Sequence, residues 1–151
     1  MFYGGRVMDK DVRRSIILDN YQNASNRCRH DNDSSYRKMN TRSSTCIDNL
    51  DLYIKIKDDK IEDVSFDGEA CVISTSSTNI MADLIKGKSV DEAIEIIRNY
   101  DNMIDEAEYD KDMVGDAIVY DDISKQPARI KCATLSWNGI YKELVKYKEG
   151  K

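Results

Sequence analysis

A segment of alternating apolar and polar residues, 50–57, constrains the fold of this chain more than any other stretch. Its apolar positions are Leu50, Leu52, Ile54 and Ile56. Successive side chains of a strand point to opposite faces, so this pattern predicts a strand with one buried face. Residues 58–60, Asp-Asp-Lys, provide a turn, and residues 61–66 return as a second strand. Residues 36–42 supply a short third strand, which gives a small, half-buried antiparallel sheet.

Apolar residues at three-to-four spacing predict helices before and after the sheet. Four of them are expected, at residues 9–23, 71–86, 90–98 and 128–148. Gly87 ends the second, Ser89 and Glu92 form a capping box for the third, and Pro127 suits the first turn of the last. We therefore predict a single α+β domain over residues 1–151, in which a three-stranded antiparallel sheet has helices packed on one face.

Residues 99–125 fit this pattern poorly. The stretch is acidic and only weakly periodic, and it offers one short helix around residues 113–119. We expect it to be an excursion from the domain rather than part of the core.

Composition narrows the class of protein. A chain of 151 residues, 40% hydrophobic and 34% charged, can bury a core without disulfides. A formal charge of −5 argues against binding to nucleic acid or to an anionic membrane surface. No apolar run is long enough to span a bilayer, and the first 15 residues lack the apolar core of a signal peptide. We expect a cytoplasmic protein with no membrane partner.

Candidate metal ligands stand at the entrance to the alternating segment, where Cys46 and Asp48 are two residues apart. In an extended chain residues i and i+2 point the same way, so the thiolate and the carboxylate would converge. A lone Cys-x-Asp is also common by chance in an acidic chain, where the aspartate caps a turn. The spacing alone leaves both interpretations open, because it lacks the paired Cys-x₂-Cys of familiar zinc sites.

Two further cysteines can complete a tetrahedral site. Cys71 stands at the start of a predicted helix, where unpaired amides and the helix dipole stabilise a thiolate. Cys132 lies inside the last helix, and Arg129 is one turn before it on the same face. A guanidinium there would offset the negative charge of the ligands, although a surface arginine explains the position equally well.

Other polar residues have simpler explanations. Cys28 and His30 lie two apart in a polar loop, residues 23–35, and without a second pair nearby we do not expect them to be ligands. Residues 74–78, Ser-Thr-Ser-Ser-Thr, either give the second helix small side chains for close packing or place hydroxyl donors near a sulfur site. We favour close packing.

Over most of its length the sequence resembles the SufU branch of the IscU-like (NifU N-terminal domain) family of iron–sulfur cluster assembly. Four segments carry the resemblance: IILDNYQNASNR, TCID, FDGEACVISTSSTNIMADLIKGKS and PARIKCATLSW. The family's ligand positions correspond to Cys46, Asp48, Cys71 and Cys132. Lys131 stands where scaffold-type IscU proteins have histidine, and residues 99–125 resemble the insertion of the SufU branch.

The resemblance implies a zinc-dependent sulfurtransferase. A pyridoxal-phosphate cysteine desulfurase of the SufS type would form a persulfide, one of its side chains would displace Cys46 from zinc, and Cys46 would accept the sulfur for a downstream iron–sulfur scaffold. The alternative is an IscU-type scaffold that builds an iron–sulfur cluster on the same ligands.

Two departures from the family are visible. Ile47 replaces a glycine between Cys46 and Asp48, which predicts a strained backbone and altered metal affinity or reactivity there. Ala24 and Cys28 replace a proline and a glycine in the first loop, where we expect little effect.

Overall fold

The computed structural model describes residues 9–42 and 47–150, and its strands form one antiparallel sheet. They are β1 (Arg37–Arg42), β2 (Asn49–Lys57) and β3 (Lys60–Glu69). Their order is β1-β2-β3, so each strand pairs with its neighbour in sequence. Asp58 and Asp59 both have positive φ at the turn between β2 and β3, a conformation that short polar side chains tolerate better than most others. The predicted sheet is confirmed.

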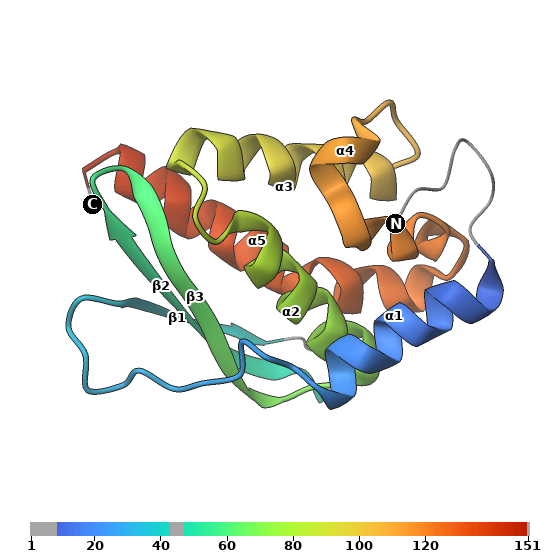
Figure 1. Ribbon diagram of the computed structural model, residues 1–151, viewed down its shortest axis with the longest axis horizontal. Coiled ribbons are helices and arrows are strands. Elements are labelled where there is room, and N and C mark those ends of the chain that lie inside the picture. The colour runs from blue at the N-terminus through green and yellow to red at the C-terminus, as the bar shows by residue number, and fades with distance from the viewer. Residues whose placement is uncertain (1–8, 43–46, 151) are drawn as a thin grey trace.

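The helices lie on one side of this sheet (Figure 1). In the described part of the chain they are α1 (Lys10–Gln22), α2 (Val72–Ile85), α3 (Val90–Ile104), α4 (Lys111–Val114) and α5 (Pro127–Lys148). Helices α2 and α5 pack on the strands and on each other, α1 packs on α2, and α3 packs on both α2 and α5. The α+β class with helices on one face is therefore confirmed. Among the described helices, none has the length and apolar character that a membrane span requires.

The alternating residues of β2 form the floor of the core. Leu50, Leu52 and Ile54 are completely buried, and they belong to the apolar cluster that α2 and α5 complete. Helix α5 approaches the sheet closely at Gly139, where a Cβ atom would lie 2.7 Å from Cγ2 of Thr41. The alternation of apolar and polar residues in β2 thus determines which face of the sheet the helices cover.

The second face of the sheet is covered by the loop that follows α1. The Tyr53 side chain, which points away from the helices, is nevertheless completely buried and donates a 2.6 Å hydrogen bond to Oδ1 of Asp31. His30 stacks on Tyr36 at 3.9 Å between ring centroids and meets Tyr53 edge-on. Hydrogen bonds from Arg29, Lys38 and Tyr53 lower the pKa of Asp31. The loop is thus an ordered cover for Tyr53 rather than a freely solvated segment.

Two elements extend beyond their predicted ends. The second strand was expected to end at residue 66, but β3 continues to Glu69, which pairs with Asn49. Helix α3 continues past residue 98 to Ile104, because Tyr100 and Met103 extend its apolar face and are buried. Both extensions bring additional residues into the ordered domain.

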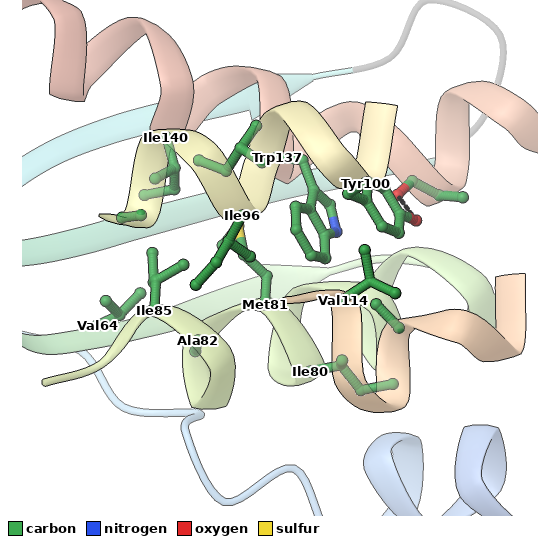
Figure 2. Close-up of a cluster of buried hydrophobic side chains, with 14 of the residues drawn as sticks. Val64, Ile80, Met81, Ala82, Ile85, Ile96, Tyr100, Val114, Trp137 and Ile140 are labelled. Atoms are coloured by element: carbon green, nitrogen blue, oxygen red, sulfur yellow. Dashed lines mark hydrogen bonds between the residues drawn. The ribbon is translucent and has the colours of Figure 1, made fainter. Parts of the chain in front are cut away.

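The prediction that residues 99–125 lie outside the core is wrong. After α3 and α4 the chain forms two short 3₁₀ segments, Gly115–Tyr120 and Ile123–Lys125. Figure 2 shows the ring of Tyr100 beside that of Trp137 from α5, and their centroids are 3.7 Å apart. Beyond α3, the buried apolar residues of this stretch are Val114, Ala117, Ile118, Val119, Tyr120 and Ile123. The insertion therefore contributes to the core, because its apolar residues recur at the spacing of tight turns rather than of an α-helix.

This burial makes a prediction about stability. Ile123→Ala should lower the free energy of unfolding by about 2–5 kcal/mol, because it removes a buried side chain that is only 3% exposed and leaves a cavity. Ile47 is 72% exposed, and Ile47→Ala is the matched control, with an expected change within about 0.5 kcal/mol. Urea denaturation followed by circular dichroism measures both. Equal small changes would show that residues 99–125 are not part of the cooperative core.

Candidate metal centre

Three separate elements bring ligand-type side chains together at one end of the sheet. Asp48 directly precedes β2, Cys71 is the N-cap of α2, and Cys132 lies in the second turn of α5. One ligand atom from each of these residues lies within 4.8 Å of the others. Cys46, the fourth residue of the predicted set, lies outside the described residues. The structure therefore assembles the part of the predicted set that it describes.

Asp48 is held in place by the start of α2. It is 1% exposed, and its Oδ1 accepts a 2.8 Å hydrogen bond from the main-chain N–H of Cys71. Its Oδ2 lies 3.9 Å from Sγ of Cys71. One carboxylate oxygen thus joins the sheet to the helix, while the other faces the sulfur.

Cys71 caps α2 with its own side chain. Its backbone is extended, with φ −69° and ψ 171°, and Sγ accepts a 3.4 Å hydrogen bond from the main-chain N–H of Ser74. The start of the helix therefore directs a main-chain amide at the sulfur.

Cys132 is brought to the site by the packing of α5 on α2. The residue is 9% exposed, and its carbonyl oxygen accepts a 3.0 Å hydrogen bond from the hydroxyl of Ser74. Cys71 and Cys132 therefore approach each other across the interface between these two helices.

The donor set fits a zinc ion. Zinc binds thiolates at about 2.3 Å and carboxylates at about 2.0 Å, so tetrahedral ligand atoms lie about 3.4–3.8 Å apart. The three residues offer two sulfurs and one oxygen within 4.8 Å of one another, so they need only small movements to reach those separations. A fourth ligand must come from elsewhere, and Cys46 is two residues from Asp48 in the chain.

The hydroxyl-rich start of α2 serves close packing, as predicted, and Ser74 also places its hydroxyl 3.0 Å from the carbonyl oxygen of Cys132. Residues 74–78 are all buried, at 1% exposure or less. Ser77 donates to the carbonyl of Ala133 at 2.8 Å, and Thr78 bonds to Ser136 at 2.8 Å. Ser76 shares a hydrogen bond with Tyr120, whose pKa is raised by burial. These short side chains let α2 pack closely and leave their own hydroxyls bonded.

Two residues singled out beside the ligands are exposed. Arg129 lies on the surface of α5, and its side chain makes no ion pair with any part of the chain that the structure describes. Its predicted role in offsetting ligand charge stays a prediction. Ile47 is a large apolar side chain exposed next to Asp48, and the strain predicted there also stays a prediction.

Cys28 and His30 lie in the loop beneath the second face of the sheet. Cys28 is exposed, its main-chain N–H donates to the carbonyl of Phe66, and His30 packs on Tyr36. Within residues 9–42 and 47–150, the group with metal-ligand geometry contains neither of them. The expectation that they are not ligands stays a prediction.

Gly68 supports the site in a way that the sequence analysis missed. It lies within β3 at φ +133°, and a Cβ atom there would be 2.3 Å from the carbonyl oxygen of Asn49, the neighbour of Asp48. The available signal was a glycine at the end of an alternating segment, which can mark a close backbone approach as well as a turn.

The fold and the site together define a class of protein, a small α+β domain in which two cysteines and an aspartate converge where the sheet meets two helices. The chain belongs to the NifU-like N terminal domain family, which it matches over residues 12–151. The resemblance to IscU-like proteins seen in the sequence is confirmed.

Individual relatives cover most of the chain. It is 39% identical to the zinc-dependent sulfurtransferase SufU of Bacillus subtilis, over 91% of this chain and 92% of that protein. It is 40% identical to the iron–sulfur cluster assembly scaffold protein IscU of Streptococcus pyogenes, over 68% of this chain and 64% of that protein. A crystal structure of a SUF-system scaffold protein from Fervidobacterium islandicum has a TM-score of 0.75 and 33% identity, and the match covers 82% of this chain and 89% of that one.

The contact at Gly68 predicts a mutational effect. Gly68→Ala should destabilise the fold by more than about 2 kcal/mol and weaken metal binding, because the new Cβ must displace the backbone beside Asp48. Gly87→Ala is the control, since Gly87 also has a positive φ of +83° but has no atom near its Cβ position. Gly87→Ala should lower the free energy of unfolding only by the cost of placing an alanine at positive φ, about 1–2 kcal/mol. Thermal unfolding and metal content would be measured for both variants. Equal effects of Gly68→Ala and Gly87→Ala would refute the steric clash at Gly68.

Proposed function

We propose that this protein is a zinc-dependent sulfurtransferase that accepts persulfide sulfur from a pyridoxal-phosphate cysteine desulfurase for iron–sulfur cluster assembly. The observation that carries the proposal is the convergence of Asp48, Cys71 and Cys132 to within 4.8 Å. The relation to the Bacillus subtilis sulfurtransferase supports this activity, and Lys131 in place of a histidine beside Cys132 favours it over a scaffold.

The proposed ligand set is Cys46, Asp48, Cys71 and Cys132. When bound, zinc would keep its thiolate ligands deprotonated and lower their reactivity until one of them is released. Asp48, Cys71 and Cys132 stand on the ordered frame of the sheet and two helices, which suits them to retain the metal. Arg129 would support the site from the surface of α5.

Cys46 is the proposed acceptor. Its thiolate attacks the terminal sulfur of the donor persulfide, so that a new S–S bond forms on Cys46 while the S–S bond of the donor breaks. The desulfurase cysteine leaves as a thiolate, and the transferred sulfur keeps its proton. A downstream iron–sulfur scaffold would then take the sulfur from Cys46.

The second candidate function is an iron–sulfur cluster scaffold, which the relation to the Streptococcus pyogenes scaffold protein favours. The same soft ligands can bind iron. Anaerobic reconstitution with iron and sulfide separates the two functions, because a scaffold develops the visible absorption of a cluster and a sulfurtransferase does not.

Metal analysis tests the proposed cofactor. Aerobically purified protein should contain about one zinc per chain, bound mainly by sulfur. Elemental analysis gives the stoichiometry, and X-ray absorption at the zinc edge gives the ligands. A spectrum without sulfur neighbours at about 2.3 Å would refute the site.

Substitutions of the ligands test the proposed roles. Cys46→Ser should abolish persulfide transfer and weaken zinc binding without eliminating it. Cys71→Ser and Cys132→Ser should lose the metal and loosen their helices, because both residues lie on elements packed on the core. Asp48→Ala should increase zinc exchange before it lowers affinity, because a carboxylate is the hardest ligand of the set.

Mass spectrometry after incubation with a desulfurase and cysteine measures the outcome. The added sulfur is expected on Cys46 in the wild-type chain. Sulfur found on Cys132 while Cys46 stays unmodified would overturn the assignment and favour the scaffold function.

A further inference from the structure

Ser74 contacts both cysteines of the described site, although they belong to different helices. Its main-chain N–H donates to Sγ of Cys71 at 3.4 Å, and its hydroxyl donates to the carbonyl oxygen of Cys132 at 3.0 Å. The side chain is almost completely buried, with 1% of the residue exposed. One residue therefore connects the start of α2 to the second turn of α5 at the point where the thiols meet.

The hydroxyl bond constrains Cys132 directly. A carbonyl inside a helix normally accepts a hydrogen bond only from the amide four residues later. An extra donor from another helix therefore restrains both the rotation of α5 about its axis and its position along α2. The carbonyl and Sγ belong to the same residue. Holding the carbonyl 3.0 Å from Ser74 therefore limits the positions that Sγ of Cys132 can reach relative to Cys71.

Other bonds hold the two helices together without reaching the thiols. Ala133 of α5 accepts a hydrogen bond from Ser77 of α2 at 2.8 Å, and another from Tyr100 of α3 at 2.6 Å. Thr78 bonds to Ser136 at 2.8 Å, one turn farther from the site. The interface therefore keeps its general packing when the Ser74 hydroxyl is removed, and the effect on the thiols can be measured separately.

We propose that Ser74 is a positioning residue, whose hydroxyl holds Cys132 at metal-binding distance from Cys71. That the two cysteines bind a metal rests on the proposed function, whereas the positioning of their sulfurs by Ser74 does not. Some residues orient metal ligands by hydrogen bonds without binding the metal themselves. Substituting such a residue typically changes metal affinity by about 10–100-fold. Loss of the Ser74 hydroxyl should act in the same way, through Cys132.

The first experiment measures zinc release from the holoprotein to a chromophoric chelator. Ser74→Ala keeps the main-chain bond to Cys71 and removes only the hydroxyl, and it should release zinc at least about tenfold faster than the wild type. Ser136→Ala is the matched control, because it removes a buried hydroxyl from the same helix interface one turn away. It should shift the urea midpoint by a similar amount and leave the release rate within about twofold. Ser74→Thr retains the hydroxyl and should restore slow release.

The second experiment needs no zinc. Phenylarsine oxide binds two thiols only when they stand side by side, and in a Cys28→Ser, Cys46→Ser chain the remaining pair is Cys71 and Cys132. Ser74→Ala should weaken capture of the arsenical by the zinc-free chain, whereas Ser136→Ala should not. If Ser74→Ala matches Ser136→Ala in both experiments, the positioning role is refuted. If the wild type binds no zinc, the proposed function fails and arsenical capture alone decides the role of Ser74.

Discussion

The close packing of α2 on α5 and on the sheet is the constraint on which the rest of the structure depends. The first turns of α2 are buried although residues 74–78 are all polar, and a buried hydroxyl costs free energy unless it is hydrogen-bonded. Their short side chains meet that requirement in two ways. Ser74, Ser77 and Thr78 bond to carbonyls and a hydroxyl of α5. Thr75 bonds to the carbonyl of Ala70, and Ser76 bonds to the carbonyl of Val72 and to Tyr120. The consequence for the site is direct, because the same contact that closes the core also brings Cys132 to Cys71.

The link between the sheet and the helices is equally specific. Asp48 is a buried carboxylate, and its bond with the amide of Cys71 joins the start of β2 to the start of α2. An anionic oxygen at a helix N-terminus is favourable, because the first amides of a helix have no partners within it. Asp48 therefore stabilises the frame through one oxygen, and it faces Sγ of Cys71 with the other.

The sequence predicted the elements whose periodicity is regular and missed contacts that depend on distant partners. Leu50, Leu52 and Ile54 indicated the buried face of β2, and the capping box at Ser89 marked the start of α3. The insertion was misjudged because its apolar residues follow 3₁₀ turns, and because Tyr100 is buried by residues distant in the sequence, Tyr120 and Trp137. Likewise, no local pattern shows that Asp31 covers Tyr53.

The candidate site was predictable in its residue types but not in its geometry. Asp48, Cys71 and Cys132 come from three distant segments. Their ligand chemistry allowed one shared site, and the family resemblance assigned them to it. Their meeting depends on features without a local signature, such as the hydroxyl of Ser74 on the carbonyl of Cys132 and the missing side chain of Gly68. These features follow from the packed fold, so a sequence pattern alone does not reveal them.

The position of the site relative to the core bears on how it can work. A zinc finger unfolds without its metal because it has little other core, whereas this domain buries a large apolar cluster formed by the sheet, α2, α3, α5 and the insertion. The ligands stand at the edge of that cluster, at the start of β2, the start of α2 and the second turn of α5. In the proposed zinc centre, one ligand could therefore leave the metal while the core holds Asp48, Cys71 and Cys132 in place. The proposed sulfurtransferase, which releases a cysteine from the metal to accept sulfur, needs this independence, and a purely structural zinc site does not.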